Sequence, residues 1–85
     1  GVLAGFAAET DDLVANAMEK LRRKECDMVI ANDVGREDAG FDSEENEVII
    51  CLPSGSTEIL PKQPKNALAR EIIRRVAALA AVRTR

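Results

Sequence analysis

The 85-residue chain contains no histidine, tryptophan or tyrosine, and phenylalanine occurs only as Phe6 and Phe41. Without histidine, the side chain that most often transfers protons near neutral pH is missing, which excludes histidine-based triads and histidine metal sites. The scarcity of aromatic residues predicts an aliphatic core, as in helices layered on a sheet. Glycine-rich phosphate loops of the GxGxxG and GxxxxGK[ST] types are also absent.

Cysteine is scarce as well, and no CxxC pair occurs. Cys26 and Cys51 lie beside or within apolar runs, so we interpret both as small buried residues rather than as a disulfide or a reactive thiol. This usage is typical of the reducing cytoplasm. No apolar run approaches the ~20 residues that span a bilayer, and residues 1–8 lack the pattern of a signal peptide. Because the chain opens inside an apolar run and without methionine, we expect it to belong to a longer polypeptide.

Charge is distributed unevenly along the chain. Residues 1–61 carry 5 Lys and Arg against 14 Asp and Glu, a balance of −9, whereas residues 62–85 carry 7 against 1, a balance of +6. The basic segment has no interleaved aromatic residues that would stack on bases, which argues against nucleic-acid binding. A solvated helix face with cations toward its C-terminus explains the pattern better.

The first 33 residues have the pattern of a strand, a helix and a strand. Residues 2–8 are an apolar run typical of a strand buried on both faces. Thr10 is a candidate N-cap, and the two aspartates that follow suit the positive end of a helix. Residues 26–32 form the next apolar run, and two strands joined in this way predict a right-handed parallel crossover. The helix reaches about Lys24 and has apolar residues at helical spacing: Leu13, Val14, Ala17, Met18 and Leu21.

The remainder of the chain predicts a hairpin followed by a helix. Residues 33–46 are typical of a polar loop and do not match the calcium-loop pattern. Residues 47–52 and 57–60 are strand-like, and the short Pro/Gly turn between them favours an antiparallel hairpin. Pro64 suits the first turn of the last helix. That helix reaches about Val82 and has one apolar stripe: Leu68, Ile72, Ile73, Val76, Leu79 and Ala80.

The order β-α-β-β-β-α predicts an α/β fold, as a piece of a Rossmann-like three-layer sandwich. We expect the two parallel strands to be central, and the antiparallel hairpin to extend the sheet toward an edge. An exposed hairpin edge is a natural place for a second subunit to pair.

Three residues of the first unit are candidates for contact with a nucleotide. Lys20 and Lys24 are one helical turn apart, so their ammonium groups, about 6 Å apart, suit an anion such as a triphosphate; a solvated face is the simpler alternative. Phe6 lies near the carboxyl end of a predicted parallel strand, where α/β sheets bind ligands, and either contacts a base or packs in the core. Asn32 and Asp33 end the next strand, where capping a turn is favoured over touching a ligand.

The run from Gly5 to Thr10 resembles the GFAAET signature of the phosphopantothenate–cysteine ligase module. This module is usually the C-terminal half of the bifunctional phosphopantothenoylcysteine decarboxylase/phosphopantothenate–cysteine ligase family. Several separated motifs that agree in one order indicate this family more strongly than any one of them. The similarity continues in the expected order through Ala17, Lys20, Lys24, Asp27, residues 31–34, 40–41 and 45–48, Lys65 and Ala69.

The resemblance implies that residues 1–85 are the C-terminal part of the ligase (phosphopantothenoylcysteine synthetase) domain, and that the upstream part is absent here. In this family CTP and Mg²⁺ activate 4′-phosphopantothenate as an acyl-cytidylate, and cysteine then displaces CMP, in coenzyme A biosynthesis. By position, Phe6, Lys20 and Lys24 match family residues at the CTP site, whereas no catalytic residue and no metal ligand are assigned. FMN belongs only to a fused decarboxylase half.

The resemblance also implies a homodimer, and the composition predicts a cytoplasmic protein that binds neither nucleic acid nor membrane. We expect the 85 residues alone to be inactive, since the glycine-rich segment and the lysine-rich flap of the family precede the GFAAET run. One alternative is a non-catalytic segment that completes a sheet and pairs two subunits. Chance agreement of motifs in an unrelated small α/β module is another.

Overall fold

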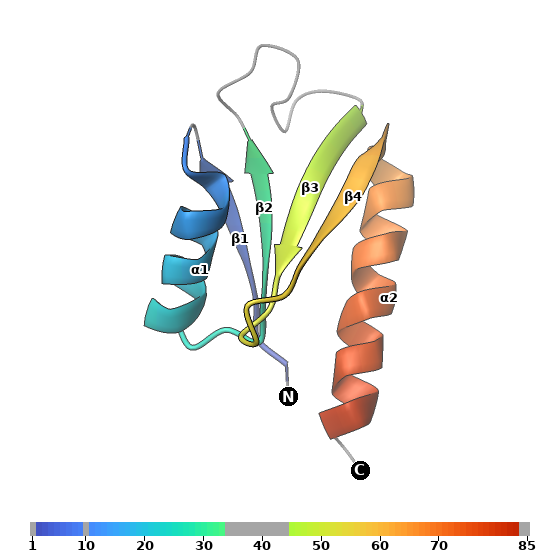
Figure 1. Ribbon diagram of the computed structural model, residues 1–85. Helices are drawn as coiled ribbons and strands as arrows, with labels where there is room; N and C mark the ends of the chain where they lie inside the picture. The colour runs from blue at the N-terminus through green and yellow to red at the C-terminus, as the bar shows by residue number, and fades with distance from the viewer. Residues whose placement is uncertain (1, 10, 34–44, 84–85) are drawn as a thin grey trace.

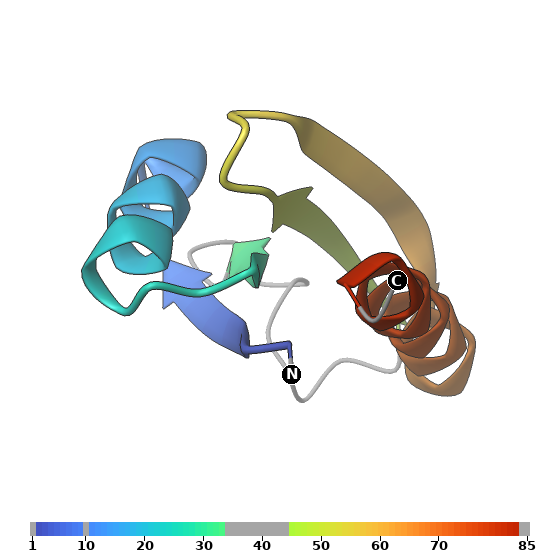
Figure 2. The ribbon, with the colours of Figure 1, turned by 90° about the horizontal axis from the view of Figure 1, so that it is seen from below.

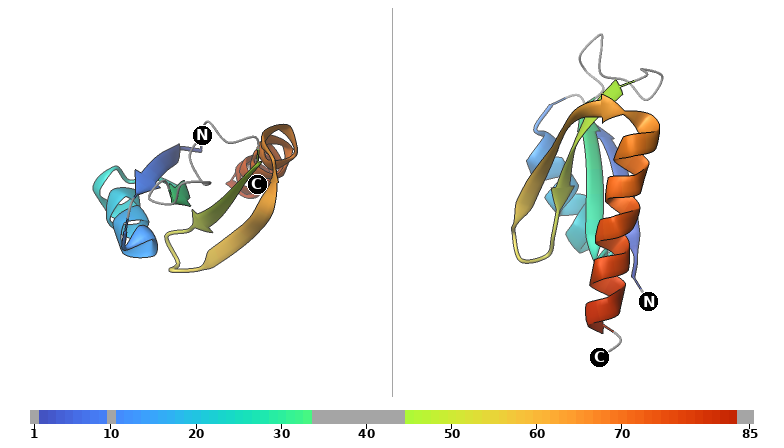
Figure 3. Two further views of the ribbon diagram at one scale, coloured as in Figure 1. Left: turned by 90° about the horizontal axis from the view of Figure 1, so that it is seen from above. Right: turned by 90° about the vertical axis from the view of Figure 1, so that its right-hand side faces the viewer.

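The computed structural model describes residues 2–9, 11–33 and 45–83. They form one mixed sheet with strand order β1-β2-β3-β4, and the two helices lie on opposite faces of it (Figures 1 and 2). Figure 3 shows α2 in front of the sheet and α1 behind it. The predicted three-layer α/β architecture is confirmed. Along the chain the elements are β1 (Ala4–Glu9), α1 (Leu13–Arg23), β2 (Met28–Asp33), β3 (Glu45–Cys51), β4 (Thr57–Pro64) and α2 (Lys65–Arg83).

The pairing of the strands confirms both the parallel crossover and the antiparallel hairpin. β1 pairs with β2 in parallel, and β3 pairs antiparallel with β2 and with β4. β3 pairs directly with β2, so the hairpin extends the sheet from the parallel pair, as predicted. Within the described part of the chain, β1 and β4 are therefore the two edges of the sheet.

β2 is buried on both of its faces. Met28 and Ile30 pack with α2, whereas Val29 and Ala31 pack with α1, and none of the four is more than 3% exposed. Successive side chains of a strand point to opposite faces, so a strand between two helical layers must be apolar at every position. The unbroken apolar run in the sequence is the signature of this place in the fold.

The start of α1 differs from the prediction. Thr10, the expected N-cap, lies outside the described residues, and the N-cap is Asp12, whose side chain makes no capping hydrogen bond. Both aspartates precede the helix, so its first turn has no acidic residue. The Asn16 amide instead donates to the Asp11 carbonyl at 3.0 Å and to Glu9 Oε2 at 3.5 Å, which ties the helix start to the end of β1.

β4 is longer than predicted. It runs to Pro64, and α2 begins at Lys65, so Pro64 ends the strand and does not open the helix. An edge strand tolerates proline, because its outward side needs no N–H donor. The register with β3 also shifts between Asn46 and Val48, which leaves one extra residue in β4 near Pro61.

The buried stripe of α2 is narrower than predicted. Leu68 is buried, and Ile72, Val76 and Leu79 pack against the same cluster. Ile73 is 66% exposed, because it lies about 100° around the helix from Ile72. In the described part of the chain, neither helix combines the length and apolarity needed to cross a membrane.

α1 ends in a turn that two backbone hydrogen bonds close, and this turn requires one residue in the left-handed backbone conformation. The Cys26 N–H donates to the Leu21 carbonyl at 2.9 Å and the Glu25 N–H to the Arg22 carbonyl at 3.3 Å, which is a Schellman motif. Glu25 occupies the left-handed position with φ 52°. Glycine is the usual residue there, since a β-carbon is strained in this conformation.

Glu25→Gly is therefore expected to raise the free energy of unfolding by about 0.5–1 kcal/mol. Urea denaturation measures the change. Arg22→Gly, in the last helical turn, is the matched control and should lower stability by a similar amount. A loss of stability in Glu25→Gly would contradict this account of the helix end.

Candidate functional site

Lys20 and Phe6 meet at the outer edge of β1. Lys20 is in the last turn of α1, and its Nζ donates a hydrogen bond to the backbone carbonyl of Phe6. The Leu3 carbonyl accepts from the Asp27 N–H at 2.7 Å and so points toward β2. Because carbonyls alternate in direction along a strand, the Phe6 carbonyl, three residues on, points away from β2. The lysine thus covers an edge carbonyl that no strand pairs with in the described residues.

Gly5 makes this approach of α1 to β1 possible. A β-carbon on Gly5 would lie 3.1 Å from Cys26 Sγ and 3.9 Å from Lys20 Cε. The first distance is shorter than ordinary van der Waals contact, so a larger residue would push the helix end and the strand apart. The glycine of the GFAAET run therefore lets the end of α1 lie close to β1.

The Phe6 side chain lies on the opposite face of the sheet from α1. It lines a hollow together with Ile30 and Asn32, on the side that α2 covers. Phe6 is 55% exposed, so it is not part of the core formed by the described residues. Phe6 is also the third of six residues in β1, and not near its carboxyl end as expected.

Lys24 forms the C-cap of α1, and its side chain is exposed. Its backbone N–H donates to the Lys20 carbonyl at 2.9 Å. The basic residues of this last turn also complement the helix dipole, and Arg23 pairs with Glu19 at 3.6 Å. The structure therefore brings Lys20 to Phe6, whereas Lys24 lies one turn further on, at the C-cap of α1. A role for any of the three at a nucleotide site stays a prediction.

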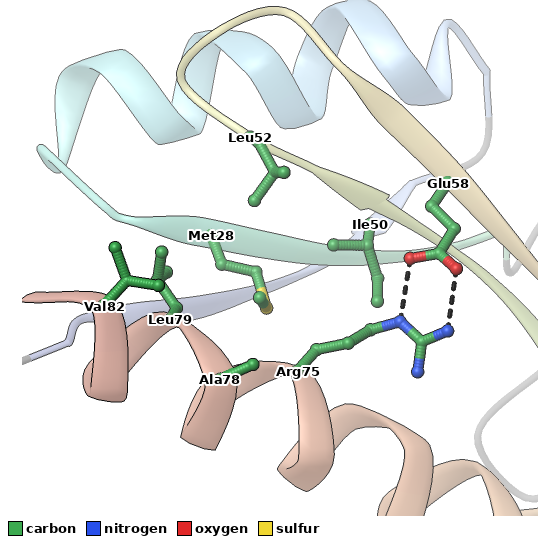
Figure 4. Close-up of a pocket in the computed structure, with 8 residues that line it drawn as sticks. All are labelled: Met28, Ile50, Leu52, Glu58, Arg75, Ala78, Leu79 and Val82. Carbon is green, nitrogen blue, oxygen red and sulfur yellow. Dashed lines mark hydrogen bonds and ion pairs between the residues drawn. The ribbon is translucent and has the colours of Figure 1, made fainter.

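The face of the sheet that α2 covers carries two separate hollows between this helix and the strands. The upper one, of about 170 Å³, lies beside the start of α2 and contains Phe6 and Lys65. The lower one, of about 280 Å³, is drawn in Figure 4 and is lined by apolar side chains of β2, β3 and the end of α2. Its polar groups are Glu58 and Arg75.

Glu58 and Arg75 are paired with each other across the lower hollow. Arg75 Nε and Nη2 donate to the two carboxylate oxygens of Glu58 at 2.8 and 2.7 Å (Figure 4). These hydrogen bonds hold the pKa of Glu58 below its usual value. The pair joins β4 to α2, and sequence analysis missed it because two residues 17 positions apart give no local spacing signal.

Asn32 is the polar residue whose environment the sequence did not reveal. Its side chain is 1% exposed and lines the upper hollow. Neither Oδ1 nor Nδ2 has a hydrogen-bond partner among the described residues, so the expected turn cap is not formed with them. The sequence does contain a signal for this burial, because Asn32 directly follows four residues that are buried on alternate faces.

Both cysteines are free and buried. Their interpretation as small core residues is therefore confirmed. Burial raises the pKa of the Cys51 thiol, which keeps the sulfur protonated and unreactive.

Residues 1–79 match the family model described as DNA/pantothenate metabolism flavoprotein C-terminal domain. The chain belongs to this family. It is similar to a coenzyme A biosynthesis bifunctional protein CoaBC of Vibrio vulnificus (strain YJ016), with 41% identity over 75 residues, which are 88% of this chain and 18% of the relative. A cysteine/cysteine sulfinic acid decarboxylase from an unknown prokaryotic organism is 38% identical over 78 residues, 92% of this chain and 22% of its own.

A solved structure supports the same assignment. The crystal structure of the C-terminal domain of a coenzyme A biosynthesis bifunctional protein CoaBC superposes with a TM-score of 0.74 at 34% identity, over 94% of this chain and 38% of that one. The resemblance found in the sequence is thereby confirmed, as is its fold. The chain spans about a fifth of the length of the curated relatives it matches.

Gly5→Ala is expected to lower the free energy of unfolding by about 1–3 kcal/mol, because the new methyl group overpacks the contact with Cys26. Urea denaturation of Gly5→Ala and of the double variant Gly5→Ala/Cys26→Ala measures the coupling between the two positions. Removing the sulfur should restore part of the loss.

Gly55→Ala is the matched control. Gly55 has φ 93° and nothing within 4 Å of its added β-carbon, so its cost comes from backbone strain. That cost should be the same with and without Cys26. An equal cost of Gly5→Ala in both backgrounds would show that close packing is not the role of Gly5.

Proposed function

We propose that this segment supplies part of the CTP site of a phosphopantothenate–cysteine ligase in coenzyme A biosynthesis. The observation that carries the proposal is the hydrogen bond from Lys20 Nζ to the Phe6 carbonyl at the edge of β1. It holds a cation beside an exposed aromatic residue, within the signature run of the family. An ammonium group and a flat ring are the two groups that a nucleotide needs, one for phosphate and one for the base.

The geometry favours a nucleotide that lies along the outer edge of β1. Lys20 approaches this edge from the α1 face, while the Phe6 ring belongs to the other face. A ligand at the edge is within reach of both, whereas one confined to a single face is not. Lys24, one turn beyond Lys20, extends the cationic side of this path and would meet the far end of a triphosphate.

The chemistry that these residues serve is charge stabilisation. The carboxylate of 4′-phosphopantothenate attacks the α-phosphorus of CTP and pyrophosphate leaves; the cysteine amine then attacks the acyl-cytidylate and CMP leaves. Lysine ammonium groups offset the charge of the triphosphate and stabilise the charge that moves onto pyrophosphate. Mg²⁺ would arrive with the nucleotide phosphates, to which it binds readily, and we propose no metal ligand from this chain.

The complete reaction needs more than the present chain, which spans about a fifth of its relatives. We propose that the remaining ligase elements lie upstream, that 85 residues alone are inactive, and that FMN belongs to a fused decarboxylase part. The parent protein is proposed to be a cytoplasmic homodimer.

The exposed edge of β4 favours a second role in subunit pairing. Ile59, on this edge strand, is 62% exposed. Its neighbours in sequence, Glu58 and Leu60, point to the α2 face, so Ile59 lies on the other one. An exposed edge that presents an apolar side chain suits pairing with a second sheet, and this segment would then complete a dimer without touching substrate.

Lys20→Ala and Lys24→Ala, made in the whole natural polypeptide, are each expected to weaken CTP binding by about 1–3 kcal/mol, or about 5- to 150-fold in Kd. Isothermal titration with CTP and Mg²⁺ measures the effect. Arg22→Ala, which removes an equal charge from the same helix turn, should leave the Kd nearly unchanged.

Unchanged CTP affinity in both lysine variants would contradict the nucleotide role and leave the subunit-pairing role. An equal loss in Arg22→Ala would show that only the general charge of the helix matters.

A further inference from the structure

The lower hollow is an apolar depression that the described residues leave open. Its floor contains Met28 and Ile50, which are 3% and 2% exposed, and its rim contains Val82, which is 65% exposed. Its volume is about 280 Å³, whereas an apolar cavity of about 150 Å³ already holds a benzene molecule. Protein interiors leave few voids of this size. The hollow is therefore large enough for a bulky apolar side chain.

The polar border of the lower hollow is already satisfied. Arg75 Nε and Nη2 donate to Glu58 (Figure 4), and Arg75 Nη1 donates to the carbonyl and the carboxylate of Glu71 at 2.9 and 3.3 Å. A charged or strongly polar group would lose water in this hollow without gaining a free partner. The occupant that fits is apolar. An aromatic ring fits best, because it also suits the guanidinium of Arg75 and the sulfur of Met28.

The start of the chain enters the sheet beside this hollow. Ala4, the first residue of β1, pairs with Met28 and packs against the same apolar cluster. The Leu3 N–H donates to Asp27 Oδ2 at 2.8 Å and the Asp27 N–H donates to the Leu3 carbonyl at 2.7 Å, which fixes the point of entry. The chain start and the last turn of α2 lie at the same end of the molecule, on one side of the sheet (Figures 1 and 2). Because each extended residue spans about 3.3–3.6 Å, a segment a few residues long reaches from this point to the hollow.

We propose that the segment directly preceding residue 1 in the natural polypeptide crosses the lower hollow and fills it with an apolar side chain, for which an aromatic ring is the best fit. The present chain is 18% of one relative and 38% of the solved C-terminal domain that it matches, so the parent has ample chain to supply this segment. Phe6, the aromatic residue among those described, lines the upper hollow instead. The inference rests on the part of the proposed function that places the remaining ligase elements upstream, and not on the CTP site.

A segment joined to residue 1 suits the lower hollow better than a second copy of the chain or a separate protein. The backbone holds such a segment near the hollow, which gives it a high effective concentration without any further contact. A separate partner would first lose its translational and rotational freedom. Filling the hollow from this side would fasten the end of α2 to the start of β1, the strand that carries Phe6.

The first test asks whether the hollow is covered in the whole natural polypeptide. Val82→Cys and Ala81→Cys place thiols at adjacent exposed positions of α2, and Val82 lines the hollow whereas Ala81 does not. Mass spectrometry follows the reaction of each thiol with N-ethylmaleimide. We expect Val82→Cys to react at least about tenfold more slowly than Ala81→Cys, because its thiol becomes accessible only when the preceding segment opens.

The second test identifies the segment that covers the hollow. Val82→Asp places a carboxylate at the rim, at a position that is exposed in the described chain, so the fold should persist while the preceding segment is released. Hydrogen exchange read by mass spectrometry should then show faster deuterium uptake in the peptides that directly precede residue 1. Ala81→Asp adds the same charge to the same helix turn and should leave this uptake unchanged.

Equal reaction rates of the two thiols would overturn the inference. Faster uptake that appears elsewhere in the polypeptide and spares the preceding segment would also overturn it, as would protection of Val82→Cys that disappears on dilution, which contact with a second copy would produce. If the Lys20 and Lys24 variants still weaken CTP binding in any of these cases, the proposed CTP site stands. Normal CTP affinity in the lysine variants, together with slow labelling of Val82→Cys and faster uptake in the preceding segment of Val82→Asp, would reject the CTP site and support this inference.

Discussion

The burial of β2 on both faces is the constraint from which the rest of the structure follows. The side chains of Val29 and Ala31 complete the core beneath α1, and those of Met28 and Ile30 complete the core beneath α2. A loss of apolar volume on this strand would open one of the two cores directly. The same position between two layers carries the next side chain, Asn32, into the interior. A polar residue at the end of such a strand is costly for folding.

The edge of β1 shows how the residues of the GFAAET run determine the local geometry. Gly5 faces α1 and leaves room for the end of the helix, Phe6 projects to the other face, and Ala7 is buried beneath α1. Alternation along the strand thus separates a close helix contact from an exposed ring by a single residue. Lys20 approaches from the α1 side, and its long side chain reaches the backbone carbonyl of Phe6 at the strand edge. Gly5, Phe6 and Ala7 can have these different surroundings although they are adjacent, because successive side chains of a strand point to opposite faces.

Much of the fold follows from the sequence because its signals are local. The order of elements, the parallel crossover and the antiparallel hairpin depend on apolar periodicity and on one Pro/Gly turn. The edge position of β1 does not follow from local signals, since it depends on which strand β3 pairs with. The exposure of Ile73 was missed because a stripe read at 3- and 4-residue spacing includes residues at its margin. The Glu58–Arg75 pair joins two elements with no periodic relation.

The candidate site, too, could be predicted only in part from the sequence. Lys20 was identified from its spacing to Lys24 and from the family resemblance, and the structure adds its contact with Phe6. Asn32 looked like a turn cap, because its residue type is common at strand ends. Its side chain is buried without a hydrogen-bond partner among the described residues because α2 packs over the strand. Packing of distant elements is information that a local pattern does not contain.

The most direct measurement of the central claim is a structure of the whole polypeptide with CTP and Mg²⁺ bound. The account predicts a triphosphate oxygen within about 3 Å of Lys20 Nζ, with the nucleotide running along the outer edge of β1. A triphosphate bound elsewhere, with the hydrogen bond from Lys20 to the Phe6 carbonyl intact and the β1 edge empty, would contradict it.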